Sequence, residues 1–241
     1  MTRLNNNFLG DPPSQIRAWS GGDEEDAYLK NCATQPLDWY YRDLKIEYSF
    51  NSNGHRCKEI DDIDLSNYLL FSGCSNTVGV GLELEKTYPH VVSKKLGCDY
   101  YNIAISGTGI DAVAFNIITW INVNKQAPRA IIIQVPEITR VLIADGGENF
   151  DAAGPWTKNR DLQTFISAGD EVGFFLARIT LFKKLLLNIS PCPIYFYEVH
   201  PCNLTPGSLV IDTARDMRHP GINCQIAYAE MICSDLDPLF N

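Results

Sequence analysis

Hydrophobic and polar positions divide the chain into two parts that meet near residue 63. Residues 1–62 are polar and irregular, with scattered aromatic side chains and an acidic patch at 23–26. Within this part, residues 39–48 are compatible with a short strand, and residues 51–56 are typical of a turn. We expect the whole of 1–62 to pack on the main domain as an N-terminal extension.

From residue 63 to residue 241, short apolar runs alternate with amphipathic segments. The apolar runs predict buried strands, which span 68–71, 101–105, 130–135 and 194–199. Apolar residues at helical spacing predict helices, which span 88–96, 109–123, 171–189 and 221–233. The segment 141–160, between the third strand and the third helix, is interpreted as a long loop.

Strand and helix alternate throughout this second part, which favours a parallel sheet with helices on both faces. The sequence therefore predicts one α/β domain over 63–241, with a three-layer α/β/α architecture and a flavodoxin-like parallel sheet. Ligands of such sheets bind beyond the carboxyl ends of the strands. Functional residues are therefore expected in the loops that follow the predicted strands.

Composition narrows the functional classes. A net charge of −9 argues against nucleic acid or an anionic membrane as the main partner, because both would repel the chain. The cysteines form no Cys-x-x-Cys pair, so neither a zinc site nor a disulfide framework is expected. The start of the sequence lacks an apolar signal region and no run reaches membrane-spanning length, so reduced thiols in a cytoplasmic compartment are the expectation. No two histidines share a metal-ligand spacing, and we expect neither a metal nor another cofactor.

The first candidate for chemistry lies directly after the first predicted strand of the core. Gly73 permits a sharp turn there, and Ser75 on that turn would project its hydroxyl over the edge of the sheet. If a helical turn begins at this point, its free N–H groups would face a developing oxyanion. The alternative is an ordinary polar loop between a strand and a helix. The motif is not the Gly-x-Ser-x-Gly elbow of α/β-hydrolases.

A second candidate, the pair Asp216 and His219, follows the last predicted strand. Three-residue spacing in a turn can place the carboxylate beside the imidazole and fix its tautomer, which leaves the other ring nitrogen to accept a serine proton. A surface turn is the alternative. The other histidines are expected to be structural or solvated, although His200 lies at a strand end, where functional residues are common. They are His55, His90 and His200.

In this order, the residues resemble the SGNH (GDSL-like) hydrolase superfamily over the whole α/β part of the chain. Ser75, in Gly-Cys-Ser-Asn-Thr, resembles the first block of that family. Gly107, in Ile-Ser-Gly-Thr, resembles the second-block glycine, and Asp216 with His219 resembles the final block. The resemblance implies a serine esterase that cleaves a small acyl ester, with an O-acetylated carbohydrate as the first substrate to consider. It also implies that the N–H groups of Ser75 and Gly107 hold the oxyanion.

The sequence departs from the family pattern at two places. Cys74 stands where the name-giving motif has Asp. The third block of the family carries an asparagine that donates to the oxyanion, and residues 134–140 contain none. Gln134, Thr139 and Arg140 are the candidate replacements, and Arg140 is favoured because it lies in the loop past Pro136, where it can reach further, and brings a full positive charge. The alternative is an oxyanion hole with two backbone donors alone. The alternative function is a catalytically weak or inactive SGNH-fold module that binds a ligand or has a structural role.

Trp156, within the segment interpreted as a long loop, is a candidate stacking surface for a sugar or an apolar acyl group. A solvated acidic loop is the alternative there. A flavin- or nucleotide-binding protein of similar architecture is disfavoured, because no Gly-x-x-x-x-Gly-Lys motif is present. The expected partner is therefore a small-molecule or glycan ester.

Overall fold

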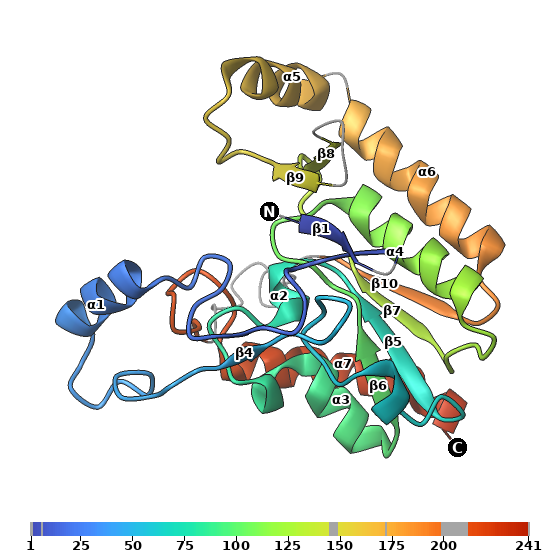
Figure 1. Cartoon of the computed structure of the whole chain (residues 1–241), viewed down its shortest axis with the longest axis horizontal. Helices are drawn as coiled ribbons and strands as arrows, with labels where there is room; N and C mark the ends of the chain where they lie inside the picture. The colour runs from blue at the N-terminus through green and yellow to red at the C-terminus, as the bar shows by residue number, and fades with distance from the viewer. Residues whose placement is uncertain (1, 6, 145–148, 172, 199–211, 241) are drawn as a thin grey trace.

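The computed structural model describes residues 2–5, 7–144, 149–171, 173–198 and 212–240. At its centre lies a four-stranded parallel sheet (Figure 1). Its strands lie in the order β10 (Ile194–Tyr197), β7 (Ile131–Gln134), β5 (Tyr68–Ser72) and β6 (Asp99–Asn102). Because all four strands are parallel, the loops that follow them meet at one edge of the sheet.

Two helices cover each face of this sheet (Figure 1): α4 (Ile110–Val123) and α6 (Phe174–Ile189) on one, α3 (Tyr88–Leu96) and α7 (Ile222–Phe240) on the other. Both faces need a cover because successive side chains of a strand point to opposite faces, and those of β5 are apolar on both. Tyr68 and Leu70 pack with α4 and α6, whereas Leu69 and Phe71 pack with α3 and α7. The predicted three-layer α/β/α arrangement is confirmed.

The third predicted helix, over 171–189, is present as α6, which begins three residues later than expected. A further helix, α5 (Arg160–Glu171), precedes it and was not predicted. Gly173 separates them with a φ of +70°, a left-handed conformation that a continuous helix does not contain. The predicted closing helix also extends further than expected, because α7 continues to Phe240.

The prediction of a long loop over 141–160 is wrong. This segment contains the antiparallel strands β8 (Val141–Ala144) and β9 (Asn149–Ala153). Strand β9 pairs in turn with an N-terminal hairpin, formed by β1 (Thr2–Asn5) and β2 (Phe8–Gly10). The result is a second sheet, in the order β2-β1-β9-β8. Hydrogen bonds to the distant start of the chain thus complete a sheet that the local pattern does not reveal.

The rest of the N-terminal part is mostly irregular. It contains α1 (Glu25–Thr34), η1 (Ile60–Asp62) and the two-stranded pair β3 (Ile16–Arg17) and β4 (Tyr48–Ser49). Of the predicted strand at 39–48, only its last residue is in a strand. Tyr48 and Phe50 belong to a buried cluster that also includes Leu82 and Ala214. The N-terminal part therefore contacts loops from the middle and the end of the chain.

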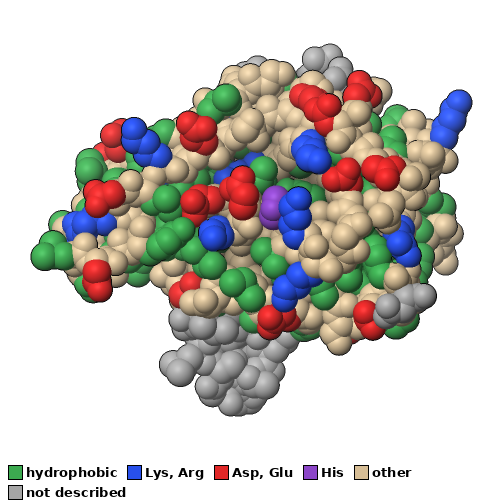
Figure 2. Space-filling model, turned by 90° about the horizontal axis from the view of Figure 1, so that it is seen from below, with side chains coloured by type: hydrophobic (Ala, Val, Ile, Leu, Met, Phe, Trp, Pro, Cys, Tyr) green, Lys and Arg blue, Asp and Glu red, His purple; other side chains and the backbone are tan. Residues whose placement is uncertain are grey.

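The surface is mixed in charge on the face that carries α3 and α7. Figure 2 shows this face, the lower side of Figure 1, with basic and acidic side chains interspersed. Its described residues form no continuous basic area. None of the described helices combines the length and the apolar character that crossing a membrane would need.

Candidate active site

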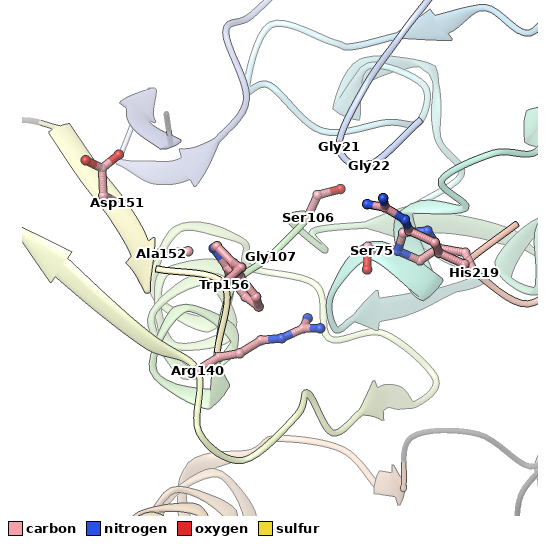
Figure 3. A pocket seen from close by; sticks show the side chains of 11 residues that line it. Gly21, Gly22, Ser75, Ser106, Gly107, Arg140, Asp151, Ala152, Trp156 and His219 are labelled. Atoms are coloured by element: carbon pink, nitrogen blue, oxygen red, sulfur yellow. The ribbon is translucent and has the colours of Figure 1, made fainter. Parts of the chain in front are cut away.

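Ser75 begins the short helix α2 (Ser75–Val78), directly beyond the carboxyl end of β5. The turn that precedes it depends on a glycine. A Cβ atom at Gly73 would lie 2.2 Å from Oγ1 of Thr77, a separation that no side chain tolerates. Ser75 is largely buried but lines a pocket at the sheet edge (Figure 3).

Side chains from two strands hold α2 in place. The Asn102 side-chain amide, at the end of β6, donates to the Thr77 carbonyl oxygen at 2.9 Å. The Thr77 hydroxyl donates to Gln134 Oε1, at the end of β7, at 3.0 Å. All three side chains are buried. The position of Ser75 is therefore fixed by groups from the strands on both sides of β5.

Arg56 is a residue that sequence reasoning did not single out. Its buried guanidinium donates to the carbonyl oxygens of Val78 at 3.1 Å, Gly79 at 2.7 Å and Leu82 at 2.8 Å. These carbonyls lie at the end of α2 and in the loop after it. Arg56 therefore ties the N-terminal part to the helix that begins with Ser75, and a charge in a predicted turn gives no sign of such a role.

Asp216 and His219 form a hydrogen-bonded pair. His219 Nδ1 contacts Asp216 Oδ2, and the backbone N–H groups of Arg218 and His219 donate to Asp216 Oδ1 at 3.1 and 3.0 Å. Burial of Asp216 would raise its pKa, but these interactions outweigh burial and lower the pKa below its usual value. Asp216 is therefore a carboxylate, and it leaves Nε2 of His219 as the ring nitrogen available to the pocket.

Ser75 and His219 line the same pocket, which has a volume of about 460 Å³. In Figure 3 these two lie on one side of the pocket and Trp156 on the other, and the Arg140 side chain extends from the Trp156 side toward Ser75. The pocket is lined by Gly21, Gly22, Ser75, Ser106, Gly107, Arg140, Asp151, Ala152, Trp156, Arg218 and His219. The structure thus brings Ser75, His219, Gly107, Arg140 and Trp156 together, with Asp216 behind His219.

Two backbone N–H groups in the pocket wall are free to act as donors. Ser75 is the first residue of α2, where no intrahelical carbonyl can accept its N–H. In the described part of the chain, neither the N–H of Ser75 nor that of Gly107 donates a hydrogen bond. Ser106, next to Gly107, also lines the pocket, and its buried hydroxyl has no partner among the described residues.

The three candidate replacements for the missing asparagine have different positions. Gln134 is buried and accepts the hydrogen bond from Thr77, away from the pocket. The Thr139 hydroxyl donates to the Glu137 carboxylate, at 2.8 and 2.7 Å from its two oxygens. Of the three, Arg140 is the one that lines the pocket.

The other histidines lie elsewhere. His55 is fully buried, and its Nε2 donates to the Leu9 carbonyl oxygen at 3.0 Å, while Nδ1 lies 3.3 Å from the Tyr101 hydroxyl. Burial lowers the pKa of His55 to about 4, so its ring is neutral at physiological pH. His90 is partly buried on α3, and burial lowers its pKa as well. His200 lies outside the described residues.

The N-terminal part also contributes to the pocket wall. Gly21 and Gly22 line it, and Gly22 lies close to Asp216 and His219. The next residue, Asp23, is buried and accepts a hydrogen bond from Arg215 Nε at 3.0 Å. Asp23 lies in the acidic patch that the sequence shows, and only the fold reveals its buried partner. Among the described residues, no cluster of histidine, cysteine or acidic side chains could hold a metal ion.

Comparisons with known proteins give remote similarities. No protein-family model matches the chain, and no curated protein matches its sequence. A carbohydrate esterase family 2 enzyme with a carbohydrate binding domain from Corynascus thermopiles (Myceliophthora fergusii) is similar in structure, with 14% identity over 78% of this chain and 70% of that one, and a TM-score of 0.41.

Two further solved structures are similar to about the same degree. An acetyl xylan esterase from the rumen bacterium Butyrivibrio proteoclasticus is 15% identical over 72% of this chain and 64% of that one, with a TM-score of 0.40. A member of the lipolytic protein G-D-S-L family from Veillonella parvula is 10% identical over 71% of this chain and 73% of that one, with a TM-score of 0.33.

Proposed function

We propose that the chain is a serine esterase that hydrolyses a small acyl ester, with Ser75 as nucleophile and His219 as base. The observation that supports it most is that Ser75 and His219 line one pocket while Asp216 holds Nδ1 of His219. This arrangement leaves Nε2 to take the serine proton. Sequence reasoning chose these three residues independently of the pocket.

The reaction follows from these groups. Ser75 Oγ attacks the ester carbonyl, and His219 Nε2 takes the serine proton as the new C–O bond forms. The N–H groups of Ser75 and Gly107 hold the oxyanion that develops. Collapse of the intermediate expels the alcohol, which receives the proton from His219. Water then attacks the acyl-enzyme by the same route and releases the acid. Asp216 stabilises the imidazolium in both stages.

An O-acetylated carbohydrate is the first substrate class to test, as the family resemblance implies. The pocket is open and large enough for a small acyl group with part of its alcohol. Trp156 is 51% exposed although its ring lines this pocket. An exposed aromatic ring beside a polar site offers a stacking surface for a sugar.

A panel of chromogenic acyl esters, from acetate to longer chains, tests the proposal. We expect the wild-type chain to prefer the shortest esters and Ser75→Ala to lose turnover. Ser106→Ala is the matched control, since it removes the other serine hydroxyl of the pocket and should retain turnover. A chelator should leave the rate unchanged. Turnover that survives Ser75→Ala, or that EDTA abolishes and zinc restores, would contradict the proposal.

A further inference from the structure

The guanidinium of Arg140 is only loosely paired in the pocket wall. Its side chain is 20% exposed, and its buried Nε and Nη1 atoms have no hydrogen-bond acceptor among the described residues. The carboxylate paired with it, Glu137, lies 3.9 Å from Nε and already accepts hydrogen bonds from Thr139. Burying hydrogen-bond donors without an acceptor is costly, so a folded chain rarely leaves them unpaired.

The surroundings of Arg140 hold it in place. Its backbone passes so close to Gly109 that a Cβ atom there would lie 2.2 Å from the Arg140 carbonyl oxygen. Arg178, on α6, donates a hydrogen bond to the same carbonyl. The guanidinium carbon lies 5.1 Å from the ring centre of Trp156. Gly109 and Arg178 thus hold the backbone of Arg140, and the Trp156 ring lies beside its side chain, which Figure 3 shows extending along the pocket wall.

The other charges of the pocket do not neutralise Arg140. Arg218 is a second cation in the lining, next to His219, and Asp151 is the acidic residue of the lining. Asp151 forms no ion pair with Arg140. The lining thus holds two arginines and one aspartate, in a chain with a net charge of −9. An arginine in a pocket wall attracts an anionic group of a ligand.

We propose, on the basis of the esterase function above, that Arg140 binds a carboxylate carried by the ester substrate. Guanidinium and carboxylate match in charge and in planar hydrogen-bonding geometry. The ester bond would lie at Ser75, and the carboxylate of its acyl or alcohol part would lie at the Trp156 end. For a carbohydrate substrate, this means an acidic sugar. The missing asparagine is then not replaced by Arg140, and the oxyanion is held by backbone donors.

Matched pairs of esters test this role. In the first pair, 4-acetoxybenzoate and its methyl ester differ in charge on the alcohol part. In the second, 4-nitrophenyl hydrogen succinate and 4-nitrophenyl butyrate differ in charge on the acyl part. We expect the wild-type chain to have a KM lower by roughly tenfold for the anionic member of at least one pair. Arg140→Gln should remove that preference with little change in kcat, and Arg140→Lys should keep part of it.

Lys125→Gln is the matched control. It removes one positive charge from an exposed position in the loop after α4, at the opposite edge of the sheet. The preference for anionic esters should persist in this variant. If wild type shows no preference, the proposed carboxylate site is wrong while the esterase function stands. If Arg140→Gln lowers kcat equally for neutral and anionic esters, Arg140 is an oxyanion donor instead and the inference is also wrong.

Binding of 4-acetamidobenzoate, an amide of the same outline as the first anionic ester, separates this inference from turnover. Calorimetry should show binding to the wild-type chain and to Lys125→Gln, and binding weaker by roughly tenfold to Arg140→Gln. Binding that depends on Arg140 in a chain that hydrolyses no ester would support the carboxylate site and contradict the esterase. Equal binding to wild type and Arg140→Gln would contradict the carboxylate site.

Discussion

His219 and His55 belong to two polar regions of the molecule that differ in what surrounds the imidazole. His219 has an exposed fraction of 17%, faces a pocket and contacts a carboxylate. His55 is fully buried, and its two ring nitrogens contact uncharged oxygens, those of Leu9 and Tyr101. The first environment places the imidazole between a carboxylate and a space that a substrate can enter. The second excludes both the charge and the substrate.

Replacing each histidine in turn should produce the largest differences between the two regions, in the rate of hydrolysis and in the melting temperature. His219→Ala should lower the rate of ester hydrolysis by at least about a thousand-fold, because the proton of Ser75 then has no acceptor. The melting temperature should change little, since His219 lies at the surface of a pocket. His55→Ala should do the reverse, with a lower melting temperature and a nearly unchanged kcat per folded molecule. Equal losses of kcat in the two variants would show that the distinction is wrong.

The pH dependence of stability should distinguish the buried His55 by a smaller effect. Above pH 6.5, His55 is neutral in both the folded and the unfolded chain. Below that pH the unfolded chain binds a proton that the folded chain refuses until about pH 4, so stability falls over this window. The difference in pKa corresponds to about 3 kcal/mol of unfolding free energy.

Urea unfolding at pH 7 and pH 4.5 measures this effect. The loss of unfolding free energy between the two pH values should be clearly smaller in His55→Asn than in wild type, even though the variant is less stable at both. His90→Asn is the control. His90 is only partly buried, so its removal should change this loss of unfolding free energy little. If His55→Asn loses as much unfolding free energy between pH 7 and pH 4.5 as wild type, the neutral, buried state of His55 is contradicted.

The fold was largely predictable because the core has strong local patterns. Most of strand β5, residues 68–71, is a continuous apolar run, and the loops after the strands of a parallel sheet lie at one edge. That rule, together with the local motifs and the family resemblance, directed attention to Ser75 and to the Asp216–His219 pair. The second sheet was not predictable, since β9 finds its partner β1 at the other end of the sequence. A pattern read locally cannot identify a partner so distant.

Several contacts at the site were likewise not predictable from local sequence patterns. The contacts of Arg56 with three carbonyl oxygens, and the buried pair of Asp23 with Arg215, depend on how loops pass each other in space. In the sequence, both Arg56 and Asp23 have the character of surface charges. The choice of Arg140 over Gln134 rested on reach and charge, and the structure places only Arg140 at the pocket.

Covalent labelling of Ser75 tests the central claim most directly. A fluorophosphonate probe should add its mass once to the wild-type chain, and peptide mapping should place that mass on the peptide that contains Ser75. Ser75→Ala should not be labelled, and His219→Ala should be labelled far more slowly, because the hydroxyl then lacks its base. Ser106→Ala should be labelled as fast as wild type. Labelling that persists in Ser75→Ala, or that maps to Ser106, would contradict the assignment of Ser75 as the nucleophile.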